Sequence, residues 1–236
     1  MTIGTVYLVP NLLGIAPPPD VLPARTIEIA RGLRHWVVET PKPARAFLKS
    51  LAPSHAISEL DIQPLPANAD AAALGKLLAP AREGHDIGLL SDAGCPGVAD
   101  PGATLVAAAH AAAIRVAPLV GPSSLLLALM ASGMNGQSFA FHGYLPVPAN
   151  ERAAALRRLE EESRALSRTQ LFIETPYRNA AMIQTLGEVL RPATQVCVAV
   201  DLTLPTESVE RRSAAEWKGE DTTRFAKRPA MFVMEA

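Results

Sequence analysis

The stretch D-I-G-L-L-S-D-A-G-C-P-G-V-A-D-P-G-A-T-L-V, from Asp86 to Val106, constrains the fold more than any other part of the chain. The apolar run Ile87–Leu90 predicts a buried strand. The pattern breaks at Ser91–Gly94, and the glycines and prolines that follow predict a shaped loop. Asp100 followed by Pro101 is typical of a helix start, with the carboxylate as N-cap. The stretch therefore predicts a strand, a tight loop and a helix.

This loop is a candidate ligand-binding segment. In open α/β sheets, ligands bind outside the carboxyl ends of the strands, in loops of this kind. Asp92, Gly94 and Gly97 follow the predicted strand and are therefore candidate ligand-binding residues. A purely structural turn, which only delivers the chain to the helix, remains an alternative interpretation of the same pattern.

Strands and helices alternate along the first half of the chain. We expect strands at 5–9, 35–39, 87–90 and 114–120, with a short strand and turn within 57–65. We expect helices at 22–33, 42–51, 69–82 and from Asp100 to about Ala113. This alternation predicts a parallel sheet covered by helices on both faces. Residues 1–119 are therefore expected to form one α/β domain, which contains the loop after Leu90.

A second α/β domain is expected over residues 120–236, with more antiparallel character. The segment Gly121–Ser124 introduces it, and an apolar helix at 125–132 follows, with Gly133 as its cap. Asn150 is expected to cap a helix that runs to about Arg168, and a further helix is expected at 178–190. The buried stripe of the 150–168 helix is expected to be Ala153, Leu156, Leu159 and Leu166. Further strands are expected at 139–145, 170–174, 196–201, 208–212 and 230–234.

Composition limits the classes of function. The formal net charge of −1 gives no overall attraction to nucleic acid, so a nucleic-acid substrate would need a local basic patch. Cys95 and Cys197 make no metal-binding or disulfide pattern. We expect no signal peptide, because the first residues lack a basic region followed by a long apolar one, and the longest apolar stretch, 125–131, is too short to span a bilayer. We expect a soluble, cytoplasmic protein without a metal.

Common catalytic and nucleotide-binding motifs are missing. No G-x-G-x-x-G follows the first strand and no Walker-type loop occurs, so ordinary dinucleotide and nucleoside-triphosphate sites are unsupported. No G-x-S-x-G elbow occurs, which disfavours a serine hydrolase. The five histidines show no metal-ligand spacing. Any chemistry must therefore come from the loops at the strand ends.

Those loops together resemble one enzyme family. They are Val9–Gly14, S-D-A-G-C-P at 91–96, Asp100-Pro101-Gly102, L-V-G-P-S-S at 119–124, F-A-F-H-G-Y-L-P at 139–146, Leu171–Glu174 with Pro176 and Arg178, and Asp201-Leu202-Thr203. In order and spacing the chain is similar to the tetrapyrrole-methylase-type, or class III, S-adenosyl-methionine-dependent methyltransferases. Within that family it most resembles the branch that methylates a cytidine ribose 2′-hydroxyl of ribosomal RNA.

The resemblance implies a fold, a cofactor and an assembly. It implies two α/β domains of the tetrapyrrole methylase type with the cofactor cleft between them, S-adenosyl-methionine as cofactor, and a homodimer. The residues that it implies for cofactor binding are Pro10, Asp92, Ala93, Gly94, Gly97, Ser123, Ser124, Glu174, Val198 and Ala199. No general base follows from the sequence, and Glu39 and Glu174 are the candidate acid/base groups.

The first two loops depart from the ribosomal branch. That branch carries T-P-I-G-N and A-E-D-T-R, where this chain has Pro10–Gly14 (P-N-L-L-G) and V-E-T-P followed by Lys42. The arginine of the second motif would meet RNA, so its absence weakens the substrate assignment more than the cofactor assignment. The resemblance still makes ribosomal RNA the first expectation for the acceptor, and a small tetrapyrrole-like metabolite is the second. A third possibility is a non-catalytic cofactor-binding module. The arginines of the 150–168 helix, including Arg157 and Arg158, could form a basic patch, although glutamates on the same helix favour an ordinary solvated face.

Overall fold

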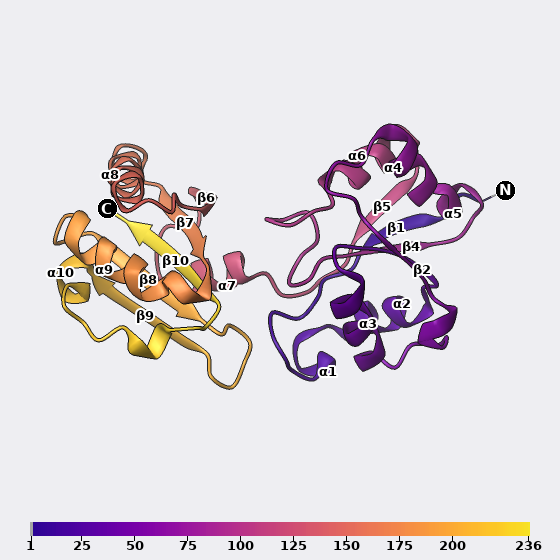
Figure 1. Ribbon diagram of the computed structural model, residues 1–236, viewed down its shortest axis with the longest axis horizontal. Helices are drawn as coiled ribbons and strands as arrows, with labels where there is room; N and C mark the ends of the chain where they lie inside the picture. Colours follow the sequence, from indigo (N-terminus) through magenta and orange to yellow (C-terminus); the bar gives the residue numbers. More distant parts are fainter. Residues whose placement is uncertain (1) are drawn as a thin grey trace. The chain divides into compact units, whose positions relative to one another are not determined.

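The chain folds into two units, each built around its own sheet. A computed structural model describes residues 2–236 (Figure 1). The first unit ends at Ser123 and the second begins at Ser124, slightly beyond the boundary expected at 119/120. Each unit holds one five-stranded sheet. Across residues 2–236, no helix has both the length and the apolar composition needed to cross a membrane.

The sheet of the first unit is wholly parallel, as expected. Its strand order is β3-β2-β4-β1-β5, and every paired neighbour runs in the same direction. The carboxyl ends of the five strands therefore meet at one edge. The strands are β1 (Thr5–Leu8), β2 (His35–Val38), β3 (Asp61–Pro64), β4 (Ile87–Leu90) and β5 (Arg115–Pro118).

Helices cover both faces of this sheet, as Figure 1 shows. Trp36 and Val38 of β2 pack with α2 and α3 in one core. Val37, between them, packs with α5 and α6 in the other, because successive strand residues point to opposite faces. The helices are α1 (Pro18–Val21), α2 (Ala24–Gly32), α3 (Pro41–Ser50), α4 (Ala71–Leu77), α5 (Ala79–Arg82) and α6 (Ala103–Ala111), with a short 3₁₀ helix at Ile57–Glu59.

Two expected helices of this unit are corrected by the structure. The helix predicted at 69–82 is divided into α4 and α5, because the ring of Pro80 disrupts an uninterrupted helix. The prediction that Asp100 caps the next helix was wrong, because α6 begins at Ala103 with Gly102 as its N-cap. Gly102 has φ +140°, and a Cβ atom there would lie 3.0 Å from Leu89 Cδ2. The loop after β4 thus extends to a position that only glycine suits.

The sheet of the second unit is mixed, which confirms the expected antiparallel character. Its order is β6-β7-β10-β8-β9. Strand β6 is parallel to β7, whereas β10 runs antiparallel to both β7 and β8, and β9 antiparallel to β8. The carboxyl ends of β7 and β8 consequently lie at the same edge. The strands are β6 (Phe139–Tyr144), β7 (Thr169–Glu174), β8 (Gln195–Val200), β9 (Ser208–Ser213) and β10 (Ala230–Glu235).

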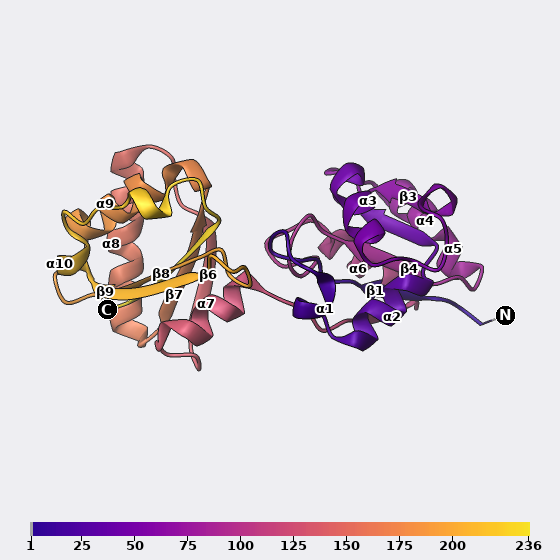
Figure 2. The same ribbon diagram turned by 90° about the horizontal axis from the view of Figure 1, so that it is seen from below.

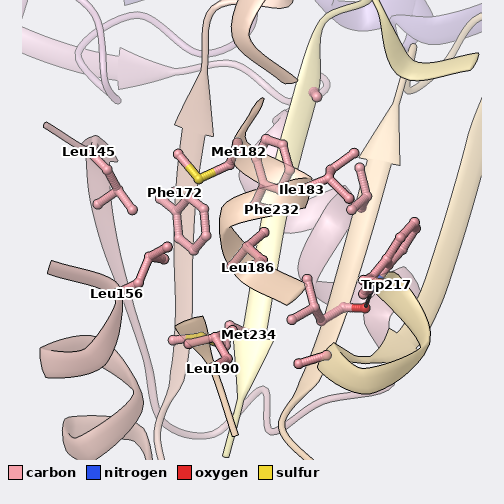
Figure 3. Close-up of a cluster of buried hydrophobic side chains, with 14 of the residues drawn as sticks. Leu145, Leu156, Phe172, Met182, Ile183, Leu186, Leu190, Trp217, Phe232 and Met234 are labelled. Carbon is pink, nitrogen blue, oxygen red and sulfur yellow. Dashed lines mark hydrogen bonds between the residues drawn. The ribbon is translucent and has the colours of Figure 1, made fainter. Parts of the chain in front are cut away.

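The main core of the second unit lies between this sheet and three of its helices (Figure 3). The rings of Phe172 and Phe232 stack at its centre, with centroids 5.4 Å apart, and Leu156, Leu186 and Trp217 close over them. Helices α8 and α9 pack side by side (Figure 2). The helices are α7 (Ser124–Ser132), α8 (Ala149–Leu166), α9 (Asn179–Val189) and α10 (Ala214–Trp217), with short 3₁₀ helices at Pro176–Arg178 and Thr223–Phe225.

Two details of the long helix α8 differ from expectation. Asn150 does not cap it, because the helix begins at Ala149 with Pro148 as N-cap. Proline at the N-cap carries no side-chain acceptor, so this helix starts without a side-chain cap bond. Leu156 and Leu159 are fully buried as predicted, but Leu166 is 52% exposed. The last turn of the helix therefore extends beyond the core.

Candidate functional site

Asn11 joins the loops that follow β1 and β4. Its backbone N–H donates to the Gly94 carbonyl at 2.8 Å, and its side-chain amide donates to the carbonyls of Ser91 at 2.9 Å and Asp92 at 3.0 Å. Asn11 is only 5% exposed. One buried side chain thus fixes the loop at 91–94 through backbone atoms. Sequence reasoning missed this role, although an amide side chain directly after an apolar strand was a usable signal.

The loop after β4 turns on residues with left-handed backbone. Gly94 has φ +63° and Gly97 has φ +81°, and Ala99 between the loop and α6 also has positive φ, at +64°. A Cβ atom at Gly94 would lie 3.3 Å from Leu13 Cδ2 and 3.7 Å from the Pro122 carbonyl oxygen. The backbone angle, more than lack of space, therefore requires glycine at position 94.

Three carboxylates gather where β2 and β4 end. Glu39 Oε2 accepts the Asp92 N–H at 3.0 Å, and Asp92 Oδ2 accepts the Thr40 hydroxyl at 2.8 Å. Burial, together with the charges of Glu39 and Asp92, raises the pKa of half-buried Asp100 to about 6. This concentration of negative charge favours a ligand that carries positive charge.

The loop after β5 lies against the other two loops of this edge. A Cβ atom at Gly121 would lie 2.2 Å from Pro10 Cγ, so Pro10 and the backbone of Gly121 are in close contact. The Cys95 thiol donates to the Pro122 carbonyl at 3.4 Å. Ser123 follows directly, as the last residue of the unit. Loops after three strands therefore form one continuous edge.

Most of the predicted cofactor residues of the first unit belong to this edge. Asp92 and Ala93 are exposed on it, and Gly94 and Pro10 are buried within it. The Ala93 carbonyl accepts the Ser91 hydroxyl at 3.0 Å. Ser124, predicted alongside Ser123, is the first residue of α7 in the second unit.

Glu174 ends β7 at the corresponding edge of the second unit. It is 4% exposed, and its Oε1 atom accepts the Arg178 Nε–H at 2.9 Å and the backbone N–H of Thr175. Its Oε2 atom is buried without a hydrogen-bond partner within the described chain. Buried polar atoms without partners are rare and call for an explanation. Glu174 thus has one oxygen free for a ligand.

The connection that follows β8 supplies a second buried polar atom without a partner in the described part of the chain. Ala230 of β10 pairs with Glu174 on one side and Val200 on the other. Beyond Val200 the chain adopts left-handed backbone at Asp201, with φ +50°, and Thr203, with φ +73°. The Thr203 hydroxyl is also buried without a partner among residues 2–236. The segment Asp201-Leu202-Thr203 is one of those that carry the family resemblance, but the sequence did not indicate a role for this hydroxyl.

Val198 and Ala199, predicted to contact the cofactor, lie within β8. Val198 is fully buried and its side chain belongs to the main core of the second unit. Ala199 is 1% exposed, and it pairs with Met231 of β10 and Val209 of β9. Their side chains are therefore buried, and only the backbone that follows them, at Val200, lies at the end of the strand.

The two candidate acid/base residues both make structural bonds. Glu39 accepts a backbone N–H, as described, and Glu174 forms an ion pair with Arg178. Each carboxylate is therefore held in one orientation, which suits positioning a ligand group. Among residues 2–236, no set of three or more His, Cys, Asp or Glu side chains is arranged to hold a metal ion.

The chain is similar in sequence to proteins named ribosomal RNA small subunit methyltransferase I. It is 37% identical to the protein of Micromonospora olivasterospora over 193 residues, which covers 80% of this chain and 58% of that protein. It is 37% identical to the protein of Vibrio cholerae over 144 residues, 60% of this chain and 49% of that protein. The chain thus spans about half the length of the curated relatives that it matches. No family model matches it.

Solved structures with the same fold are named as methyltransferases. Uroporphyrin-III-C-methyltransferase from Thermus thermophilus matches with a TM-score of 0.57 and 21% identity, covering 98% of this chain and 92% of that one. The methyltransferase CobJ matches with a TM-score of 0.62 and 18% identity, covering 100% and 94%. The chain therefore has the two-unit α/β fold of the tetrapyrrole methyltransferases, and its sequence is similar to that of ribosomal RNA small subunit methyltransferase I.

Proposed function

We propose that this chain is an S-adenosyl-methionine-dependent methyltransferase, and that the strand-end loops of its first unit bind the cofactor. The observation that carries the proposal is the loop after β4, where Asn11 and left-handed glycines hold exposed Asp92 beside two further carboxylates. The similarity to proteins named as methyltransferases, over much of the chain, supports the same reading.

The residues at this edge fit the chemical groups of that cofactor. When bound, the cofactor supplies an activated methyl group on a positively charged sulfonium. The carboxylates of Glu39, Asp92 and Asp100 suit positive charge, and Asp92 can accept hydrogen bonds from an amine or a ribose. Backbone groups exposed at glycine positions can approach a ligand closely.

Catalysis by this chain is expected to depend mainly on positioning. Rigidly held groups contribute by keeping two reactants at near-attack geometry. The loop at 91–94 is held by three hydrogen bonds to Asn11, and Glu39 is held by the Asp92 backbone. Glu39 and Asp100 are the carboxylates that can receive a proton from an acceptor hydroxyl at this edge. Burial and neighbouring charge keep the pKa of Asp100 near 6, within reach of such a role.

We propose ribosomal RNA as the acceptor, with the ribose 2′-hydroxyl as the first candidate atom. The sequence relatives carry that substrate in their names. The test is methyl transfer from labelled S-adenosyl-methionine to small-subunit ribosomal RNA, followed by mass spectrometry of the digested nucleosides. A single methylated ribose supports the proposal, and absence of transfer to RNA from cells lacking the gene contradicts it.

Two alternatives follow from specific observations. The solved structures of this fold are named for uroporphyrin and cobalt-precorrin substrates, which favours a small tetrapyrrole-like acceptor as the second candidate. The structural bonds of Glu39 and Glu174 also fit a non-catalytic module that only binds the cofactor. Transfer to a tetrapyrrole but not to RNA identifies the first, and cofactor binding without any transfer identifies the second.

We also propose a homodimer that acts in the cytoplasm, where ribosomal RNA is available. Helix α7 exposes Leu126 by 50% and Met130 by 77%. These side chains are one helical turn apart and can be buried together in an interface. Light scattering should give about twice the 25.0 kDa chain mass, and a monomer at micromolar concentration contradicts the dimer.

A further inference from the structure

Helix α3 carries three positive charges and no negative one. Its sequence, P-K-P-A-R-A-F-L-K-S, places Lys42, Arg45 and Lys49 at helical spacing. With about 100° between successive residues, these three side chains fall within an arc of about 60°. Ala44, Phe47 and Leu48 form the buried side of the helix, which lies opposite that arc. The helix therefore presents one basic stripe to solvent.

The stripe is electrostatically unpaired. All three side chains are exposed, and none of them takes part in an ion pair within residues 2–236. Lys42 lies in the first turn, where the helix dipole disfavours a cation and no acidic residue offsets it. Helix stability thus gives no reason for Lys42, whereas a ligand of opposite charge does.

Several basic side chains elsewhere are paired with acids or buried. Arg212 and Arg224 pair with Glu210 and Glu220, and Arg228 pairs with Asp201. On α8, the helix that the sequence suggested as a basic patch, Arg152 is only 8% exposed and Arg168 pairs with Glu162. Its other three arginines are exposed, but they share the helix with four glutamates, whereas α3 carries no acidic residue. Helix α3 is therefore a better candidate for binding an anionic polymer.

The stripe begins at the proposed cofactor edge. Thr40, the N-cap of α3, donates its hydroxyl to Asp92 Oδ2 at 2.8 Å. From Lys42 to Lys49 the helix rises about 10 Å, so the positive charges extend away from that edge along the surface. A strand of RNA with one nucleotide at the edge can lay successive phosphates along α3.

We infer that Lys42, Arg45 and Lys49 form a docking surface for the phosphate backbone of the RNA acceptor. The inference rests on the proposed function, and it adds the path by which the substrate reaches the site. Charge complementarity carries it, since a chain of net charge −1 needs a local basic surface to hold RNA. The competing occupant is an acidic patch of a ribosomal protein.

The test compares two triple variants with matched charge loss. The first replaces Lys42→Gln, Arg45→Gln and Lys49→Gln. The control replaces Arg157→Gln, Arg158→Gln and Arg164→Gln, three exposed arginines of α8. Binding to protein-free small-subunit ribosomal RNA and to intact small subunits is measured over a salt series, with S-adenosyl-homocysteine titration and thermal melts for both variants.

The inference predicts that the α3 variant binds free ribosomal RNA at least about tenfold more weakly, while the control changes by no more than about twofold. The slope of log affinity against log salt should fall by about 2, because each lost contact to a single strand removes about 0.7. Cofactor binding and melting temperature should match the parent in both variants.

Three results overturn the inference, and they are distinguishable. If the parent methylates RNA but the α3 variant binds RNA as the parent does, only the docking surface is wrong. If the α3 variant no longer binds intact subunits but binds free RNA as the parent does, the stripe binds a ribosomal protein. If the parent neither binds nor methylates RNA, the proposed acceptor fails as well.

Discussion

The strand-end edges of the two units are built by different means. In the first unit, backbone hydrogen bonds to Asn11 hold the loop at 91–94, and Asp92 remains exposed. In the second unit, charged side chains hold the edge, through the pair of Glu174 with Arg178 and that of Asp201 with Arg228. Apart from Asn11, a side chain such as that of Asp92 can therefore be removed from the first edge while these bonds to backbone carbonyls remain, whereas the second edge depends on its charged side chains.

Sheet topology accounts for this difference. In the first unit, as described from residue 2 onward, strands only end at this edge and none begins there. The segment between β4 and α6, residues 91–102, therefore has room to form a long loop. In the second unit β9 and β10 also start there, and the short connection between Asp201 and Ser208 fits beside them with left-handed backbone at two non-glycine residues. Ion pairs stabilise that crowded connection. In the first unit, a residue that contacts a ligand can thus be replaced with little loss of stability. In the second unit, the residues at the edge also stabilise the fold.

Removing Arg178 should have the largest effect on stability. Arg178→Met leaves the Glu174 carboxylate, whose side chain is 1% exposed, without its charged partner. Breaking a buried pair in this way costs about 3 kcal/mol of unfolding free energy. The control, Arg168→Met, removes the partner of the more exposed Glu162 and should cost less than about 1 kcal/mol. Urea denaturation measures both, and equal losses would contradict the distinction between the edges.

Replacing Gly94 should have an intermediate effect on stability. Gly94→Ala forces a side chain into backbone with φ +63°, which costs about 1–2 kcal/mol. The matched control is Gly136→Ala, because a Cβ atom there meets nothing within 4 Å and the backbone angle is ordinary. That control should leave stability unchanged or slightly raised. If both variants melt together, left-handed backbone does not shape the loop after β4.

Asp100 should make the smallest, pH-dependent contribution. Its folded-state pKa, about 6, is above the ordinary value of 3.8, so the folded state favours the protonated carboxyl. Stability should therefore fall as pH rises from about 4 to about 6, and Asp100→Asn should remove that fall. Because Asp100 is only half-buried, the free energy of unfolding of Asp100→Asn at pH 7.5 should exceed that of the parent by on the order of 1 kcal/mol. Denaturation at several pH values checks this, and an unchanged pH profile in the variant rules it out.

The positions of strands and helices were predictable because burial leaves a pattern in the sequence. Buried strands appear as apolar runs, and helices appear as apolar residues at helical spacing. The parallel sheet followed from the alternation, and its strands begin and end close to the expected residues. The start of α6 was not predictable, since Asp100-Pro101 has the local chemistry of a helix cap. Packing of Gly102 against Leu89 and Gly97 decides it, and those contacts come from tertiary structure.

The candidate site was predictable in part for the same reason. Loop chemistry identified Asp92 and Gly94, and the family resemblance implied Pro10; the structure places all three at one edge. The buried Thr203 hydroxyl depends on the fold of the connection after β8, and sequence carries no signal for burial of one hydroxyl. The basic stripe of α3 was readable from spacing, but its lack of ion pairs required the surrounding structure.

The central claim, that the loop after β4 binds the cofactor, is tested most directly by calorimetric titration with S-adenosyl-homocysteine. The parent should bind it, and Asp92→Ala should weaken binding at least about tenfold, or about 1.4 kcal/mol, through loss of charge-assisted hydrogen bonds. Asp20→Ala, an exposed aspartate of α1, should bind as the parent does. Absence of binding to the parent, or equal affinity in the parent and Asp92→Ala, would contradict the claim.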